Sequence, residues 1–363
     1  MIAKSKKSSP VQRAAAVLIF AVLAGVGLTD AYPAPPPLEF GTATNLGPTI
    51  NTSSHEAYAF ISADGLSLWF SRMPNSLNER PEILVATRAT KDDPWGTPVS
   101  LGLWGDPAFT YESIRVVPGL TSGDGLEVYF SDIRPGGYGS FDLWMMKRET
   151  VESGWGPPIN LGPVVNSSYQ EASPTISSDG LELYFSGYAS TNNRPAGYGG
   201  ADLWVTRRAT RNGPWGWPVN LGPTVNSASA DIFPIISAND LSLFFSSQRP
   251  GGYGQWDMYM INRGSLSEQW GQPVNLGPLI NSPGSEDAVW MSADGSTLFF
   301  NSDRPGGYGG QDIWQAPILS APTCGDADHP YPAVDLNKDC RVDLADLAVL
   351  LAHWLECTAP ECE

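Results

Sequence analysis

The chain has 363 residues, of which 42% are hydrophobic, and its 38 acidic against 21 basic side chains give a formal net charge of -17. This length suits one large domain together with a small one. So acidic a surface repels phosphate backbones and anionic lipids, which excludes nucleic acid as a partner but leaves calcium and neutral glycans compatible.

The N-terminus has the pattern of an export signal. Lys4, Lys6, Lys7 and Arg13 precede an uncharged apolar run at 14–28, which is shorter than the ~20 residues of a membrane span. Small residues then offer a cleavage site. We predict a signal peptide over residues 1–31 and a secreted or cell-surface protein, with no membrane span after signal cleavage; an uncleaved anchor is the alternative. Cleavage would leave a net charge of -20, because residues 1–31 hold four Lys/Arg and one Asp.

After a Pro-rich linker at 32–38, one unit of 55 to 60 residues recurs five times over residues 39–318. Each unit carries an acid before a short apolar stretch, a tight turn of the SADG type, an alternating strand, a Gly-rich loop, a third strand and a final strand. The Gly-rich loop reads RPGGYG from Arg134, Arg249 and Arg304, and RPAGYG from Arg194. The final strand ends in Asn-Leu-Gly at Asn45, Asn160, Asn220 and Asn275, with Ser100 in the variant copy.

Four short strands per unit make one antiparallel sheet, and radial stacking buries both faces of such sheets. We therefore predict an all-β fold, a five-bladed β-propeller of four-stranded antiparallel blades. The fifth unit lacks its last strand, and residues 40–47 are expected to supply it and close the ring. The repeated Trp and Tyr residues are interpreted as plugs between blades, with ligand stacking as the alternative.

These units resemble the bacterial WD40-like propeller repeats of the TolB type. The resemblance rests on the Asp-Gly turn, although this chain has Ala-Asp-Gly or Ser-Asp-Gly where that family has Pro-Asp-Gly. It implies a propeller and leaves function open, because the family includes scaffolds, periplasmic binding proteins and domains attached to enzymes. The turn is also similar to the Asp-box of sialidases, but its Asp and Gly are adjacent, so sialidase activity is not inferred.

One acid per unit is expected at the mouth of the central channel. One interpretation is a cation or polar-ligand site there; the other, which the recurrence in every unit favours, is that each carboxylate accepts backbone N–H groups and joins adjacent blades. The arginine of each Gly-rich loop is predicted to pair with the aspartate that starts the next strand. Ligand specificity is expected near the two irregular loops, at 73–80 and 188–193. The channel-mouth acids are Glu56, Glu112, Glu171, Asp231 and Glu286.

A linker at 319–323 leads to a small C-terminal module at 324–363. Oxygen-bearing side chains fall at positions 1, 3, 5, 9 and 12 of a loop that is typical of calcium binding, with the backbone carbonyl of Arg341 at position 7. An amphipathic helix is expected to follow, which makes the module EF-hand-like. The predicted calcium ligands are Asp335, Asn337, Asp339, Arg341, Asp343 and Asp346.

This loop and helix resemble a type I dockerin repeat. That resemblance implies a protein partner, either a cohesin-like domain or another cell-surface protein. Two departures limit the transfer, because only one loop is present and Cys340 occupies position 6, where the family has Gly.

The four cysteines all lie in this module, which predicts two disulfides in an exported segment. Three connectivities are possible. We favour Cys324–Cys340 with Cys357–Cys362, because about 12 helical residues would separate Cys340 from Cys357 by roughly 18 Å. A helix that bends or ends early reopens the other two.

The function expected from these features is a secreted, non-enzymatic binding or scaffold propeller with a calcium-dependent anchor, and polysaccharide is one expected ligand. The alternative is an extracellular glycoside hydrolase. The chain has no GxSxG or HExxH motif, and acids that are equivalent in every unit do not single out an acid and a nucleophile. His55 is the only histidine in the repeat region and adjoins Glu56.

Overall fold

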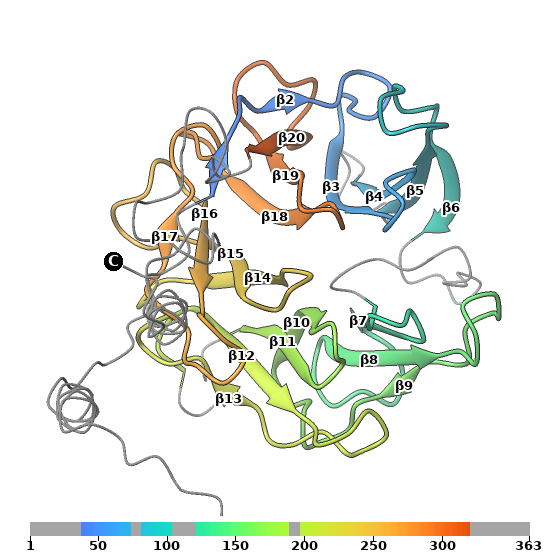
Figure 1. Ribbon diagram of the computed structural model, residues 1–363, viewed down its shortest axis with the longest axis vertical. Coiled ribbons are helices and arrows are strands. Elements are labelled where there is room, and N and C mark those ends of the chain that lie inside the picture. The colour runs from blue at the N-terminus through green and yellow to red at the C-terminus, as the bar shows by residue number, and fades with distance from the viewer. Residues whose placement is uncertain (1–37, 74–80, 104–120, 189–196, 320–363) are drawn as a thin grey trace, which may run out of the picture. The chain divides into compact units, whose positions relative to one another are not determined.

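The computed structural model describes residues 38–73, 81–103, 121–188 and 197–319. These residues form twenty β-strands, and no helix among them is long and apolar enough to cross a membrane. The strands group into five antiparallel sheets, each built from strands that are consecutive in the chain except where the N-terminus joins the last sheet. Figure 1 shows the sheets arranged as blades around a common centre, with β3, β10, β14 and β18 nearest to it. The predicted five-bladed propeller is confirmed.

The strands follow the repeat of the sequence. Blade 1 contains β3 (His55–Ile61), β4 (Ser67–Met73), β5 (Glu82–Thr87) and β6 (Val99–Leu103). Blade 2 contains β7 (Glu127–Asp132), β8 (Asp142–Lys147) and β9 (Ile159–Asn160), and the repeat places its inner strand largely outside the described residues. Blade 3 contains β10 (Gln170–Ile176), β11 (Glu182–Tyr188), β12 (Ala201–Arg207) and β13 (Val219–Asn220). Blade 4 contains β14 (Asp231–Ile236), β15 (Ser242–Ser247), β16 (Asp257–Asn262) and β17 (Val274–Asn275).

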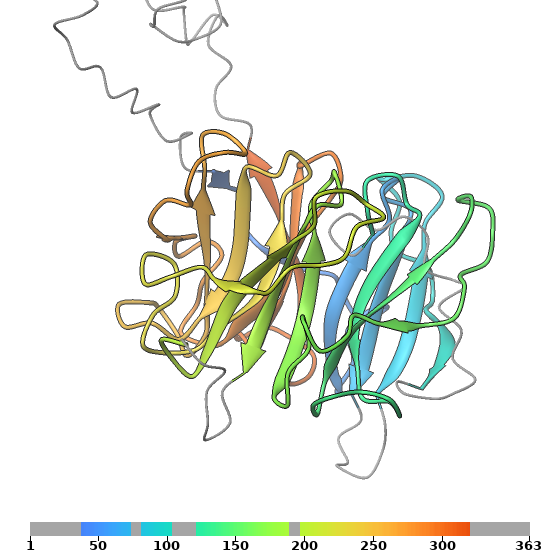
Figure 2. The same ribbon diagram turned by 90° about the horizontal axis from the view of Figure 1, so that it is seen from below.

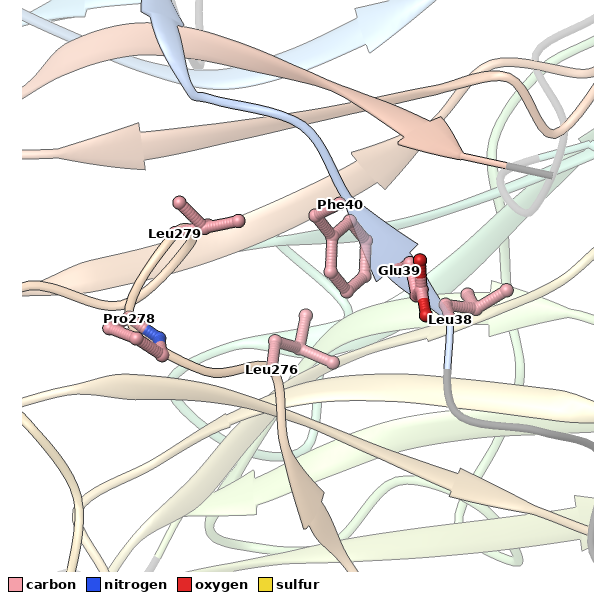
Figure 3. Close-up of a pocket in the computed structure, with 6 residues that line it drawn as sticks. All are labelled: Leu38, Glu39, Phe40, Leu276, Pro278 and Leu279. Atoms are coloured by element: carbon pink, nitrogen blue, oxygen red, sulfur yellow. The ribbon is translucent and has the colours of Figure 1, made fainter. Parts of the chain in front are cut away.

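Blade 5 combines both ends of the repeat region. It contains β18 (Glu286–Met291), β19 (Thr297–Ser302) and β20 (Asp312–Leu319), and the N-terminal strands β1 (Glu39–Phe40) and β2 (Thr44–Asn45) pair with β20. The Phe40 side chain is buried at this seam. Figure 3 shows it beside Leu276 and Leu279 of blade 4, around a small apolar pocket of about 260 Å³. The predicted closure of the ring by the N-terminus is confirmed.

Apolar side chains of each second strand fill the space between blades. Tyr184, Phe244, Phe245, Phe299 and Phe300 are at most 2% exposed, and burial of one such side chain stabilises the fold by about 1.5–3 kcal/mol. The tryptophans of the WG motifs extend this packing, because each stacks on the arginine that follows the third strand. The ring-to-guanidinium distances are 4.3 Å for Trp95 and Trp155 and 4.5 Å for Trp215 and Trp270.

Two of these tryptophans also reach the preceding blade. Trp215 meets Tyr129 at 5.9 Å and Trp270 meets Tyr184 at 6.0 Å, both edge to face. The interpretation of the repeated aromatic residues as plugs between blades is correct for these rings. It does not hold for the tyrosines of the Gly-rich loops, which remain half exposed.

The tight turn between the first two strands requires a left-handed residue at its last position. Gly65, Gly125, Gly180 and Gly295 take it with φ between 69° and 75°, as glycine does without steric cost. Blade 4 has Asp240 there instead, at φ 59°. The Asp240 carboxylate accepts the backbone N–H of Ser178 in blade 3 at 2.9 Å, so this position joins two blades.

Candidate functional site

The Gly-rich loops share one face of the propeller. Each connects the second strand of its blade to the third, and antiparallel pairing puts all such connections at the same end of the sheets. We call this the loop face, with described loops at 134–139, 249–254 and 304–309 and the end of a fourth at 197–199. Figure 2 views the blades edge-on and shows the strands running between the two faces. Leu319, the last described residue, ends a third strand and so lies at the opposite face.

The predicted channel-mouth acids lie at this end of the inner strands, but they are buried. Glu56, Glu171, Asp231 and Glu286 are each 0% exposed. Each accepts the backbone N–H four residues earlier, at 2.6–2.9 Å, and also that residue's hydroxyl. The segment that they hold connects one blade to the next, which supports the structural interpretation for these four. Glu112 lies outside the described residues.

The loop arginines of blades 4 and 5 complete these networks, and the predicted pairing of the loop arginine with the aspartate of the third strand is wrong for Arg134, Arg249 and Arg304. Arg249 contacts Asp231 at 2.7 Å and Arg304 contacts Glu286 at 3.3 Å. In blade 1, which lacks the glycine loop, Arg72 contacts Glu56 at 2.6 Å. Arg134 of blade 2 pairs with Asp132, whereas Arg194 lies outside the described residues.

The third-strand aspartates serve a different purpose, which is to fix the Gly-rich loops. Asp257 accepts the backbone N–H of Tyr253 and of Gly254, at 2.5 and 2.9 Å, and also the Nδ2 of Asn275 at 3.0 Å. Because the loop's own backbone satisfies this carboxylate, the arginine turns to the first strand instead. Asp142, Asp202 and Asp312 make the same contacts.

One glycine of each loop is packed closely against the backbone of another segment. A Cβ added at Gly254 would lie 1.9 Å from the carbonyl oxygen of Gly284, and Gly139, Gly199 and Gly309 are crowded equally by backbone oxygens at 1.8–2.0 Å. The loop is therefore packed on the chain that enters the next blade. Its tyrosine nevertheless projects into solvent: Tyr138, Tyr198 and Tyr253 are each 50% exposed and Tyr308 is 49% exposed. Four tyrosine rings thus lie on the loop face, each on a closely packed Gly-rich loop.

The inner strands share a distortion that sequence reasoning missed. Each described inner strand has a β-bulge two residues after its acid, where a residue other than glycine takes a left-handed conformation. Bulges of this kind turn side chains away from the regular alternation of a strand. The residues concerned are Tyr58, Ser173, Phe233 and Ala288, with φ between 46° and 55°.

Two of these bulged residues meet although their blades are not neighbours. The rings of Tyr58 in blade 1 and Phe233 in blade 4 are 5.7 Å apart, edge to face. Blades 1 and 4 are separated by blade 5 around the ring, so this contact lies near the central axis. Asp287 of β18 takes the position that Ala57, Ala172 or Ile232 has in the other described inner strands, and no sequence prediction singled it out.

The remaining predicted residues divide between the surface and the undescribed parts of the chain. His55 is exposed and accepts the backbone N–H of Gln311 at 3.2 Å. Among the described residues no group of three His, Cys, Asp or Glu side chains is placed to hold a metal ion. The predicted calcium ligands Asp335 to Asp346 and the four cysteines lie outside the described residues, as do the two irregular loops for the most part.

Comparisons with known proteins identify no family. No protein-family model matches the chain, and no curated protein does. Among solved structures, the chain is similar to TolB from Acinetobacter baumannii, with 12% identity over 87% of this chain and 72% of that one and a TM-score of 0.39. It is similar to an alpha-L-arabinofuranosidase from Lactobacillus brevis, with 14% identity, coverage of 78% and 94%, and a TM-score of 0.46.

A third similar structure is the catalytic domain of the Coprinopsis cinerea GH62 alpha-L-arabinofuranosidase, with 9% identity, coverage of 78% and 98%, and a TM-score of 0.49. At such values the fold assignment rests on the strand topology of this chain, and function has to be argued from its own residues.

Proposed function

We propose that this protein is an exported binding protein whose propeller captures a neutral polysaccharide on the loop face. The observation that carries the proposal is the set of four half-exposed tyrosines, each on a loop that is locked by a buried aspartate and by close packing of its glycines. Rigid aromatic side chains provide contact area at a low cost in conformational entropy. The acidic surface disfavours polyanionic ligands, whereas the faces of neutral sugars stack on aromatic rings.

The other half of the proposal is attachment through the C-terminal module. Residues 335–346 would bind calcium, and the module would dock on a cell-surface protein. The described chain leaves the propeller from the face opposite the tyrosines. An attached propeller would therefore keep its loop face free for a ligand.

Hydrolysis is the second candidate function, and the carboxylates of the inner strands are what distinguish it. A glycosidase needs two carboxyl groups about 5–9.5 Å apart, one acting as an acid and the other as a base or nucleophile. Three of the repeated acids form ion pairs with arginines and accept hydrogen bonds from backbone N–H groups. They are Glu56, Asp231 and Glu286. Asp287 differs from them, so a test of the proposal has to score cleavage as well as binding.

The experiment is a screen of the protein against neutral polysaccharides that measures retention on the polymer and release of reducing ends. We expect retention without release. Replacing Tyr138, Tyr198, Tyr253 and Tyr308 by Ala should weaken binding at least tenfold, since each stacking contact contributes about 0.5–1.5 kcal/mol. Replacing the same four residues by Phe should preserve binding, because the rings remain.

Trp217 provides the matched control. It is 73% exposed, the most exposed aromatic of the described chain, but it precedes a fourth strand and so lies away from the loop face. Trp217→Ala should leave retention unchanged. Release of reducing ends by the protein alone would replace the proposal with the hydrolase, and equal loss in the Trp217 variant would show that the loop face has no special role.

A further inference from the structure

Blade 5 departs from the other blades at one pair of facing positions. The residue after the inner-strand acid lies opposite a serine of the second strand in three blades, as Ala57–Ser71, Ala172–Ser186 and Ile232–Ser246. In blade 5 the same positions are Asp287 and Asn301. A carboxylate with an amide partner thus replaces an apolar residue with a hydroxyl partner, and only in this blade among the four whose inner strand is described.

The carboxylate is held in place but its charge is not balanced. Asn301 Nδ2 donates to Oδ1 of Asp287 at 3.1 Å, and Gln311 Nε2 donates to Oδ2 at 3.1 Å. The loop arginine of the blade, Arg304, is engaged by Glu286. No described cationic side chain pairs with Asp287, and its burial, followed by the nearby charges of Asp303 and Glu286, raises the pKa of this carboxyl above its ordinary value.

A second group beside it lacks a partner as well. Asn301 is 1% exposed, and while its nitrogen donates to Asp287, its oxygen Oδ1 is buried with no hydrogen-bond donor among the described residues. A buried acceptor without a donor costs free energy. The site therefore presents one unbalanced negative charge and one unused acceptor in adjacent side chains.

An aromatic residue of the next blade lies near this point, because β3, which carries Tyr58, packs against β18. The rings of Tyr58 and Phe233 are in contact across the central axis. Burial, and then the charge of Asp287, raises the pKa of Tyr58 to about 12. Burial also raises the pKa of Tyr188 in blade 3, with smaller contributions from Tyr58 and Asp287. Tyr58 and Tyr188 both keep part of their surface exposed.

We propose that Asp287 and Asn301, with Tyr58 of the adjacent blade, form a binding site for a primary ammonium group near the axis of the loop face. An ammonium group supplies the positive charge that Asp287 lacks and an N–H donor for Asn301 Oδ1, and aromatic rings attract cations. A quaternary ammonium would leave the amide oxygen unpaired, and a neutral hydroxyl would leave the charge unbalanced. Gln311 orients the carboxylate without needing to touch the ligand. This site is independent of the proposed polysaccharide surface.

The test is calorimetric titration of the full chain at pH 7 with N-α-acetyl-lysine amide and with glucosamine, which carry the same ammonium on a side chain and on a sugar. Their N-acetylated counterparts serve as neutral controls. We expect at least one ammonium ligand to bind, its neutral counterpart to bind at least tenfold more weakly, and the better ligand to identify the source of the group. Binding by neither ammonium, or equal binding by the neutral forms, would overturn the proposal.

Two single-residue variants test whether the ammonium group binds at Asp287. Asp287→Asn, which keeps the shape of the side chain, should lower ammonium affinity at least tenfold. Asp303→Asn, which removes the neighbouring exposed carboxylate, should lower it less than threefold. Equal losses would mean a general attraction to an acidic surface and would refute a built site. The Tyr138, Tyr198, Tyr253 and Tyr308 alanine variant should keep ammonium affinity, so failure of the polysaccharide proposal and failure of this one are distinguishable.

Discussion

Blades 4 and 5 have the same strand arrangement but differ in the residue that follows the acid of the inner strand. In both, the first-strand acid is buried, accepts a serine N–H and pairs with the loop arginine. The next position is Ile232 in blade 4, which is 5% exposed, and Asp287 in blade 5, with which no described cationic side chain pairs. The recurring acids join segments of the propeller, whereas Asp287, which only blade 5 has among the described inner strands, is the residue that we propose binds a ligand.

The largest effect is expected where the repeat is completed by the N-terminus. Deleting residues 32–47 removes β1 and β2, exposes the edge of β20 and uncovers the apolar side chains around Phe40. The propeller should lose several kcal/mol of stability. Thermal or denaturant unfolding of the deletion variant measures this loss, and a melting curve like that of the native protein would contradict the role of the seam.

The sequence predicted this architecture well because each structural part has its own recurring residues. The Asn-Leu-Gly, Asp-Gly and RPGGYG strings mark the strand ends and turns, and the missing fifth copy of the last strand predicted the closure. The prediction failed where several partners compete for one group. Arg249 and Asp257 are near each other in sequence, but the backbone of Tyr253 and Gly254 satisfies Asp257, so Arg249 pairs with Asp231.

The candidate ligand sites were missed for a related reason. The recurring positions indicated Glu56 and its equivalents, and the four that are described accept backbone N–H groups within the fold. The residue that follows the acid is Ala57, Ala172 or Ile232 in three repeats and Asp287 in the fifth, so the sequence itself contains this difference. The bulge that brings Tyr58 to Phe233 is not apparent from the sequence, because residues as unlike as Tyr, Ser, Phe and Ala adopt the same left-handed conformation there. The exposure of the loop tyrosines also required the packed structure.

A smaller effect is expected in the dependence of stability on pH. The titratable groups whose charges are coupled to that of Asp287 are Glu286 on the same strand, Asp303 just after β19, and Tyr58 and Tyr188 on β3 and β11. Because its pKa is raised in the folded protein, the folded state binds this proton more tightly than the unfolded chain does. Stability should therefore fall as pH rises from the ordinary aspartate pKa of about 4 through the raised value.

The Asp287→Asn variant lacks this proton, so its stability should fall less over the same window. Denaturant midpoints of the native protein and the variant, measured at intervals between pH 4 and 7, test the difference. Parallel curves would show that the carboxyl is balanced by another group. Ammonium affinity should change in the opposite sense, rising with pH over the same window as Asp287 ionises.

The most direct test of the distinction between recurring and singular polar residues compares two adjacent carboxylates of β18. Glu286 accepts Ser282 N–H at 2.7 Å, the Ser282 and Ser302 hydroxyls at 2.6 Å each, and the Arg304 guanidinium. Among the described residues, Asp287 accepts only the side-chain amides of Asn301 and Gln311. In denaturant unfolding at pH 7, Glu286→Gln should lose about 2–4 kcal/mol, because Arg304 and the serine donors lose a charged partner. Asp287→Asn should be as stable as the native protein or more so. A loss in Asp287→Asn as large as that in Glu286→Gln would contradict the account.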